Sequence, residues 1–297
     1  MGFNQGIGNQ IHPTAQISDN VQLGNHNYIG KNVVISGFKG SDSGKINIGD
    51  CNFIHDNTRI LMGPEGLSIG DWNVFHNSML VMGDQRMLIG HNCWFGQNTI
   101  LDSAGGLFIG NGVRVGMYSQ IWTHVASGEL IEGCSLFAKK PTQIEDDVWL
   151  VGSCSVSAGI ALGRRAIFLN GSLITKNAEP NKVYRGSPAK LVEGAQYYQD
   201  VSLDDKLEMM HTWAKDFAEQ FSDEVTVTYN ESSREIFINS TNGESLIIGI
   251  TRSERPKSDS TTYFDVADKV YTKKLTHLER RFYRSIFDHK ARFLPVE

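Results

Sequence analysis

The chain has 297 residues, a length that suits two domains better than one. Hydrophobic residues make up 40% of it, enough for a sizeable core, and a formal net charge of -5 argues against a nucleic-acid-binding protein. No apolar run approaches the roughly 18 residues that a membrane-spanning helix needs, so we expect no transmembrane segment. The N-terminus also lacks the basic and apolar regions of a secretory signal peptide.

The cysteines are scattered along the chain, at Cys51, Cys93, Cys134 and Cys154. They form no C-x-x-C pair and have no histidine-rich tract beside them. This pattern argues against a disulfide framework and against a structural zinc site. We therefore expect a reduced, cytoplasmic protein.

A sequence repeat organises the first part of the chain. An isoleucine-glycine pair recurs at steps of 19 to 21 residues, as Ile29-Gly30, Ile48-Gly49, Ile69-Gly70, Ile89-Gly90 and Ile109-Gly110. Between these pairs runs a period of six, in which the first residue is large and apolar and the fifth is small or thin. The period is clearest from Ile144 to Ile174. Such self-similarity indicates a repeat architecture.

A period of six has a definite structural meaning. Each six residues supply one short extended side and one tight corner, where glycine and asparagine accept a positive φ at low cost. Three sides make a coil of 18 residues, and the longer observed steps require bulges of one to three residues. We therefore predict a parallel β-helix. The alternative, a β-sandwich, requires alternation with a period of two and strands of varied length.

One large interruption breaks this repeat. The period stops at His124 and resumes at Ile144, so residues 125–143 are predicted to form an extended loop that leaves the β-helix. The period ends for good at Val192. We assign residues 1–192 to the β-helix domain and residues 193–297 to a second domain.

The second domain has a mixed pattern. Ser202-x-x-Asp205 resembles a helix-capping box, and apolar residues then follow on one helical face as far as Phe221. Strands are predicted near 225–229, 236–238 and 246–250, with an Asn-Gly turn before the third. A basic helix is expected over about 265–290. These elements predict a small α+β domain of unknown role.

The closing part of the repeat resembles a known family. Val148-Trp149-Leu150, Thr175-Lys176 and Gly186-Ser187-Pro188-Ala189 are similar to the last coils of the galactoside, maltose and virginiamycin-type O-acetyltransferases, which are hexapeptide-repeat enzymes. Val151, ahead of Gly152, departs from the family pattern. The resemblance covers roughly residues 10–192 and implies a left-handed β-helix and a homotrimer. It also implies acetyl transfer from acetyl-CoA, without a metal, to a sugar or surface-polysaccharide precursor.

The same resemblance implies a catalytic histidine. In the family this residue precedes an extended loop, which matches Thr123-His124 here. A neutral imidazole can take the proton of an attacking hydroxyl near pH 7, so His124 is the expected general base of a direct transfer. A buried carbonyl or carboxylate must fix its tautomer, and the sequence does not name that group. Four other histidines fall at corner-like positions and are interpreted as structural: His26, His55, His76 and His91. Cys154 is interpreted as a packing residue, and Cys134 is kept as a remote candidate nucleophile.

Donor and acceptor residues also follow from the resemblance. Residues 160–190 carry six basic side chains against the single acid Glu179, which suits the phosphates of CoA. The expected CoA-binding residues are Trp149, Gly152, Ser153, Arg164, Arg165, Ser172, Lys176 and Arg185. Asn98 and Asp102 are the expected acceptor-binding residues, although both could be turn residues.

Three other functions remain open at this point. The first is an N-acetyltransferase acting on an amino sugar nucleotide. The second is a γ-class carbonic anhydrase, which needs three histidines around zinc, but Glu129 stands where the third would follow His91 and His124. The third is a β-helix scaffold without catalysis. The sequence leaves open the acceptor, the acyl chain length and the role of the second domain.

Overall fold

The computed structural model describes residues 3–38, 44–126, 128–250 and 258–296. The chain divides into two compact units, Met1–Tyr198 and Gln199–Glu297, and each is described by itself. Among the described residues, no helix is both long and apolar enough to cross a membrane.

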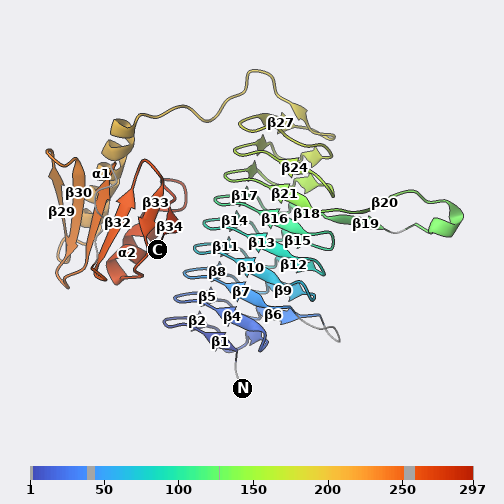
Figure 1. Ribbon diagram of the computed structural model, residues 1–297, viewed down its shortest axis with the longest axis horizontal. Helices are drawn as coiled ribbons and strands as arrows, with labels where there is room; N and C mark the ends of the chain where they lie inside the picture. Colours follow the sequence, from blue (N-terminus) through green and yellow to red (C-terminus); the bar gives the residue numbers. More distant parts are fainter. Residues whose placement is uncertain (1–2, 39–43, 127, 251–257, 297) are drawn as a thin grey trace. The chain divides into compact units, whose positions relative to one another are not determined.

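The first unit is a parallel β-helix whose described strands stack into three sheets (Figure 1). The first sheet contains β1 (Asn4–Gln5), β4 (Val21–Leu23), β7 (Ile46–Ile48), β10 (Leu67–Ile69), β13 (Met87–Ile89), β16 (Leu107–Ile109), β21 (Thr142–Ile144) and β24 (Ala161–Leu162). The second contains β2 (Gln10–Ile11), β5 (Tyr28–Ile29), β8 (Phe53–Ile54), β11 (Val74–Phe75), β14 (Trp94–Phe95), β17 (Arg114–Val115), β22 (Trp149–Leu150), β25 (Ile167–Phe168), β27 (Val183–Arg185) and the antiparallel β28 (Lys190–Leu191). The third contains β3 (Gln16–Ile17), β6 (Val34–Gly37), β9 (Arg59–Met62), β12 (Leu80–Gly83), β15 (Ile100–Asp102), β18 (Gln120–Ile121), β23 (Ser155–Val156) and β26 (Leu173–Ile174).

The register explains the sequence repeat. Ile69 lies between Ile48 on the coil below and Ile89 on the coil above, so the isoleucines of the repeated pairs from Ile48 to Ile109 stack over one another, whereas Ile29 lies in the second sheet. Each coil contributes one strand to each sheet in turn. The left-handed parallel β-helix predicted from the period of six and from the family resemblance is confirmed.

Large apolar side chains fill the axis of this unit. In the second sheet Ile54, Phe75, Phe95 and Leu150 are fully buried and belong to one continuous core. The rings of Phe75 and Phe95 stack with their centroids 5.0 Å apart. These residues occupy the apolar first position of the six-residue period, so the period encodes the core directly.

A ladder of buried asparagines supports one corner of the coils. The Asn27 side-chain oxygen accepts from the Asn52 amide, Asn52 accepts from Asn73, and Asn73 accepts from Cys93, each at 2.8 Å. These side-chain oxygens accept hydrogen bonds from backbone N–H groups at a corner, where no neighbouring strand supplies a carbonyl acceptor. The corner asparagines therefore serve as hydrogen-bond acceptors as well as turn residues.

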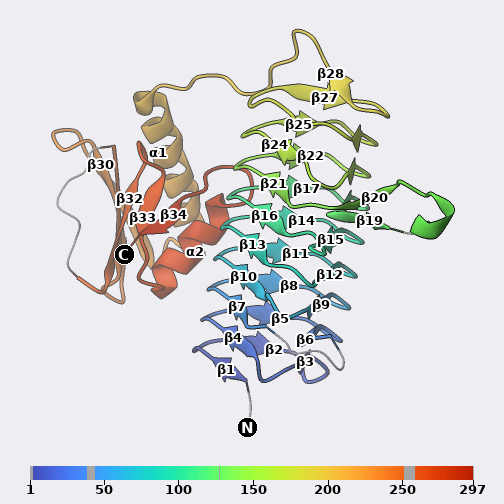
Figure 2. The same ribbon diagram turned by 45° about the vertical axis from the view of Figure 1, so that its right-hand side comes forward.

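A hairpin interrupts the coils where the sequence period stops. β19 (His124–Ala126) pairs antiparallel with β20 (Phe137–Lys139), and a short 3-10 helix (Leu130–Glu132) lies between them. Figures 1 and 2 show this hairpin projecting from the side of the β-helix. The sequence predicts an extended loop at 125–143, and in the described residues the chain leaves the coil with β19 at His124 and rejoins the first sheet at Thr142, the start of β21.

The described residues of the second unit form a six-stranded sheet with two helices. In chain order they are α1 (Leu203–Gln220), β29 (Val225–Asn230), β30 (Glu235–Ser240), β31 (Ser245–Gly249), β32 (Thr261–Asp265), β33 (Val270–Thr272), α2 (His277–Ile286) and β34 (Leu294–Val296). The Ser202 hydroxyl accepts from the Asp205 amide at 3.1 Å and begins α1 as the capping pattern predicts. The predicted three-stranded meander is also present, as β29 to β31.

The prediction of one basic helix over 265–290 is wrong. Two strands, β32 and β33, lie around its expected start, and α2 covers only His277–Ile286. Tyr271 stacks on Phe264 across the strand pair with centroids 5.3 Å apart, and Thr276 caps the helix that follows. The aromatic and β-branched residues at 270–272 favour a strand, and their packing on this sheet stabilises the strand over a helix.

The asparagine ladder yields a stability prediction. Asn73→Ala should lower the free energy of unfolding of the β-helix by about 1–3 kcal/mol, because the buried Cys93 amide loses its acceptor. Denaturant unfolding followed by circular dichroism measures this loss. The matched control is Asn77→Ala on the same coil, where the side chain is exposed. Equal stability of the two variants would contradict the role given to the ladder.

Candidate active site

His124 lies at the corner between the third and first sheets. It follows the end of β18 and is the first residue of the hairpin. Thr123 before it is fully buried, whereas the His124 side chain is 37% exposed. One coil below, Asp102 ends β15 with its side chain 1% exposed.

The imidazole of His124 is paired with this buried carboxylate. Nδ1 of His124 lies 2.9 Å from Oδ2 of Asp102. The same oxygen accepts from the Thr123 amide at 2.9 Å and from the Thr123 hydroxyl at 2.8 Å. The Thr123 hydroxyl in turn accepts from the Gly105 amide at 2.8 Å, so its own hydrogen points to Asp102. Because Oδ2 acts as an acceptor for both Thr123 groups, we infer that Nδ1 carries a hydrogen, which in the neutral imidazole leaves the lone pair on Nε2.

Strand register brings this pair together. Leu101 pairs with Ile121, so Asp102, the residue after Leu101, lies beside the segment Trp122–His124 that follows Ile121, where its carboxylate bonds to Thr123 and His124. Close approach at the corner requires glycine. A Cβ on Gly105 would lie 2.3 Å from the Thr123 carbonyl oxygen and 2.6 Å from the Lys140 amide nitrogen. The base of the hairpin therefore rests directly on the backbone of the coil below.

Two further side chains border His124. The centroid of the Trp122 ring lies 6.2 Å from that of the imidazole, and the two planes meet at 75°. Lys139 is the cross-strand partner of His124 in the hairpin. The sequence analysis names Thr123 only as part of the Thr-His match and gives no role to Trp122 or to Thr123. A signal for Thr123 exists, since it stands 21 residues after Asp102, about one coil of the repeat.

The expected donor residues lie at more than one corner of the chain. Trp149 is 43% exposed on β22 of the second sheet, and Gly152 with Ser153 forms the next corner, between the second and third sheets. Ser172 occupies the same corner one coil further on, but it is 1% exposed and its hydroxyl donates to the Leu169 carbonyl at 2.6 Å. The Ser172 side chain is thus turned away from any surface site.

The basic residues are divided as well. Arg164 and Arg165 lie at the corner between the first and second sheets, 4.0 and 3.8 Å from Asp147. Arg185 is exposed on β27. Lys176 follows β26, so it lies at the corner between the third and first sheets, as His124 does, but two coils further along the β-helix.

The acceptor residues predicted together are separated within one chain. Asn98 is an exposed corner residue between the second and third sheets, with φ 57°. Asp102 lies at the His124 corner, and its oxygens are engaged by His124, Thr123 and the Ala104 amide. A single chain therefore pairs Asp102 with His124, places Lys176 at the same corner two coils away, and leaves Asn98 at another corner.

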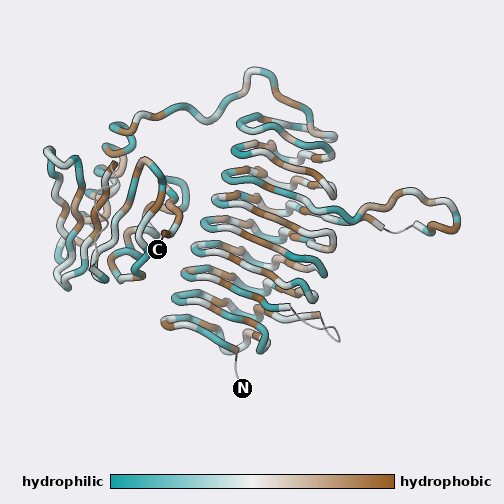
Figure 3. Tube along the Cα trace, in the orientation of Figure 1, coloured by the Kyte–Doolittle hydropathy of each residue, from teal (hydrophilic) through white to brown (hydrophobic). Residues whose placement is uncertain are grey.

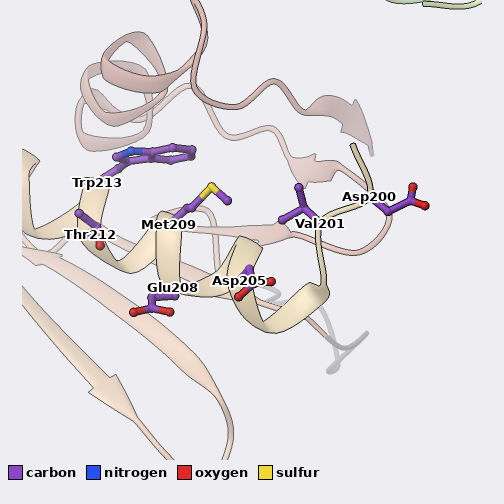
Figure 4. Close-up of a pocket in the computed structure, with 7 residues that line it drawn as sticks. All are labelled: Asp200, Val201, Asp205, Glu208, Met209, Thr212 and Trp213. Atoms are coloured by element: carbon purple, nitrogen blue, oxygen red, sulfur yellow. The ribbon is translucent and has the colours of Figure 1, made fainter. Parts of the chain in front are cut away.

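In the part of the chain that the structure describes, neither a metal cluster nor the cavity found in the second unit involves the residues of this corner. Among the described residues, no three His, Cys, Asp or Glu side chains gather closely enough to hold a metal ion. A cavity of about 450 Å³ lies in the second unit, beside Trp213 and Met209 of α1 (Figure 4). Its carboxylates include Asp205, which accepts from the Ser202 hydroxyl at the start of the helix. None of the predicted site residues lines it.

Comparison with known proteins finds acetyltransferases among the relatives of this chain. No protein-family model matches the chain. It is 26% identical over 141 residues to a galactoside O-acetyltransferase of Lactococcus lactis, a match that covers 48% of this chain and 59% of that protein. It is 31% identical over 78 residues to a 2,3,4,5-tetrahydropyridine-2,6-dicarboxylate N-acetyltransferase of Staphylococcus aureus, covering 26% of this chain and 33% of that protein.

The curated relatives are acetyltransferases. They confirm the resemblance to acetyltransferases on which the sequence predictions rest. Since the matches span 59% and 33% of these relatives, their activities and substrates apply to this chain only as proposals. Among solved structures, a maltose O-acetyltransferase from Clostridium difficile 630 is 24% identical and covers 38% of this chain and 60% of that chain, with a TM-score of 0.34.

Proposed function

We propose that this protein is an acetyl-CoA-dependent O-acetyltransferase that acts on a sugar or a surface-polysaccharide precursor. The observation that carries the proposal is the pairing of His124 Nδ1 with buried Asp102 at 2.9 Å, which leaves the other imidazole nitrogen for a substrate. The galactoside O-acetyltransferase relative supports transfer to a sugar hydroxyl. We propose a cytoplasmic location because acetyl-CoA is available there and the scattered cysteines of the sequence fit a reducing compartment.

In the proposed reaction His124 is the general base. Its Nε2 takes the proton of the acceptor hydroxyl as the hydroxyl oxygen attacks the thioester carbonyl carbon. The tetrahedral intermediate then collapses, the carbon–sulfur bond breaks, and the imidazolium returns the proton to the leaving thiolate. Such proton transfer contributes typically about 10²–10⁴-fold to the rate. No covalent acyl-enzyme is needed, so neither Cys134 nor Cys154 takes part.

Asp102 has a positioning role in this proposal. It orients the imidazole and stabilises the imidazolium that forms during attack, because it is buried and accepts three hydrogen bonds at one oxygen. This role replaces the acceptor contact expected from the sequence. Asn98 keeps the proposed acceptor role, at a different corner.

For the donor, we propose that CoA lies along exposed residues of the closing coils. Trp149, Gly152, Ser153 and Lys176 would follow the pantetheine arm, and the guanidinium groups of Arg164, Arg165 and Arg185 suit its phosphates. Lys176 and His124 share one corner of the β-helix, while the other proposed donor residues lie at different corners. A site that contains all of these residues therefore requires a second chain. We therefore propose that the donor binds between neighbouring chains of a homotrimer.

The hairpin supports this assembly. Its far end is hydrophobic (Figure 3), and the side chains of Leu130, Ile131, Leu136 and Phe137 are 70%, 90%, 66% and 58% exposed. Exposure of such an apolar cluster to water is unfavourable, so we expect a protein surface to cover it. The partner proposed is another copy of the chain.

The trimer is tested by light scattering of the full chain. Wild type should have three times the 33.0 kDa chain mass, and Ile131→Asp should shift it toward one chain because the apolar contact is lost. The matched control is Glu132→Gln in the same turn, which should leave the mass unchanged. A monomeric wild type, or a trimeric Ile131→Asp together with a trimeric Phe137→Asp, would refute the proposed contact.

The activity is tested by thiol release from acetyl-CoA in the presence of a panel of sugars, amino sugars and nucleotide sugars. His124→Ala should lower kcat at least about a hundredfold on the acceptor that responds. His12→Ala, an exposed histidine of the same unit, serves as the matched control and should stay near wild type. Equal rates for both variants would remove His124 from the mechanism.

The same panel separates the rival functions. A response only to amino groups would favour the N-acetyltransferase reading, for which the Staphylococcus aureus relative is the supporting observation. Calorimetry of the wild type with CoA tests the scaffold alternative, since a protein that binds no CoA cannot be the proposed transferase.

A further inference from the structure

We propose that the indole of Trp122 is the surface on which a pyranose ring of the acceptor stacks. This makes the acceptor a sugar ring, and it makes Trp122 a determinant of acceptor specificity. The inference rests on the proposed function, because it assumes that His124 faces the acceptor hydroxyl.

Trp122 points outward beside the candidate base. Its chain neighbours Ile121 and Thr123 are both fully buried, whereas Trp122 itself is partly exposed. A tryptophan kept for packing alone would be expected in the core, where Phe75, Phe95 and Phe168 of these coils lie. The indole instead lies next to the imidazole, with 6.2 Å between ring centroids.

The indole is held in one orientation. Its Nε1 donates to Oε1 of Gln120 at 3.1 Å, and the backbone of Trp122 is fixed by a hydrogen bond to the Val156 carbonyl at 3.0 Å. Nε1–H is the only hydrogen-bond donor of the side chain. Because that donor is already engaged, what Trp122 offers a ligand is the flat, electron-rich face of the ring.

The perpendicular arrangement of the two rings suits a sugar. The indole and imidazole planes meet at 75°, so they form adjoining walls of one corner. The C–H groups on one face of a pyranose carry slight positive charge and pack on an aromatic face, while hydroxyls project from the rim of the sugar. A ring stacked on Trp122 can therefore present a rim hydroxyl to Nε2 of His124.

Other ligands fit this wall less well. The adenine of CoA is at the opposite end of the molecule from the thioester, which must lie at His124 in the proposed reaction. The pantetheine arm is a flexible chain with amide groups and gains little from a flat ring. A small dicarboxylate needs cationic partners, and the indole face supplies none.

The test compares Trp122→Ala with Trp122→Phe in the full-length protein. Trp122→Ala should raise KM for a responding sugar acceptor about tenfold, with kcat at saturating acceptor within about threefold of wild type, because binding is lost and the base is retained. Trp122→Phe keeps a ring and should recover most of the affinity. Trp213→Ala, in the second unit, is the matched tryptophan control and should leave both constants unchanged. Melting temperatures check that each variant is folded.

Saturation-transfer NMR provides a second readout that does not depend on turnover. Ring protons of the responding sugar should receive saturation from the wild type and from Trp122→Phe, and lose it in Trp122→Ala. An unchanged acceptor KM together with unchanged saturation transfer in Trp122→Ala would overturn this inference while leaving the transferase intact. Absence of any acetyl transfer or CoA binding by wild type would instead overturn the proposed function.

Discussion

The stacking register of the coils is the constraint on which the rest of the first unit depends. Each strand pairs with the strand one coil away. Leu67 pairs with Met87, about 20 residues further along the chain, whereas Leu107 pairs with the more distant Thr142 because the hairpin is inserted between them. An outward-facing side chain on this scaffold therefore contacts mainly its neighbours in the chain and residues at the same position of the coils above and below. Backbone hydrogen bonds, the apolar axis and the asparagine ladder all enforce this one register, so a shift would disturb the three together.

The candidate site is a direct product of that register. Asp102 and His124 are 22 residues apart and meet because the third sheet aligns Leu101 with Ile121. The hairpin leaves the coil directly after Thr123, which frees the imidazole to turn outward while its partner stays buried. Gly105 permits the close contact that holds the base of the hairpin in place. The chemistry proposed for this corner needs little else from the chain, because a buried carboxylate, an oriented imidazole and an open face suffice for proton transfer.

Much of this could be predicted from local sequence, and the failures have identifiable physical causes. The period of six, the interruption after His124 and the Ser202 cap are each encoded within a few residues, so they were accessible without a structure. The basic segment near 265–290 was misjudged because the pairing of Tyr271 with Phe264 is a tertiary contact that outweighs helical periodicity. The pairing of Asp102 with His124 was missed because it depends on which residues one coil apart share a corner. Bulges make the coils unequal in length, so counting along the chain does not give that answer.

The central claim is that Asp102 acts through His124, and a double-mutant cycle tests it most directly. Acetyl transfer from radiolabelled acetyl-CoA is measured for wild type, Asp102→Asn, His124→Ala and the double variant, with folding checked by circular dichroism. If Asp102 acts through His124, Asp102→Asn should lower kcat about 10- to 100-fold when His124 is present and change it less than about twofold when His124 is already alanine. Losses that multiply in the double variant would contradict it, since Asp102 would then contribute to the reaction independently of His124.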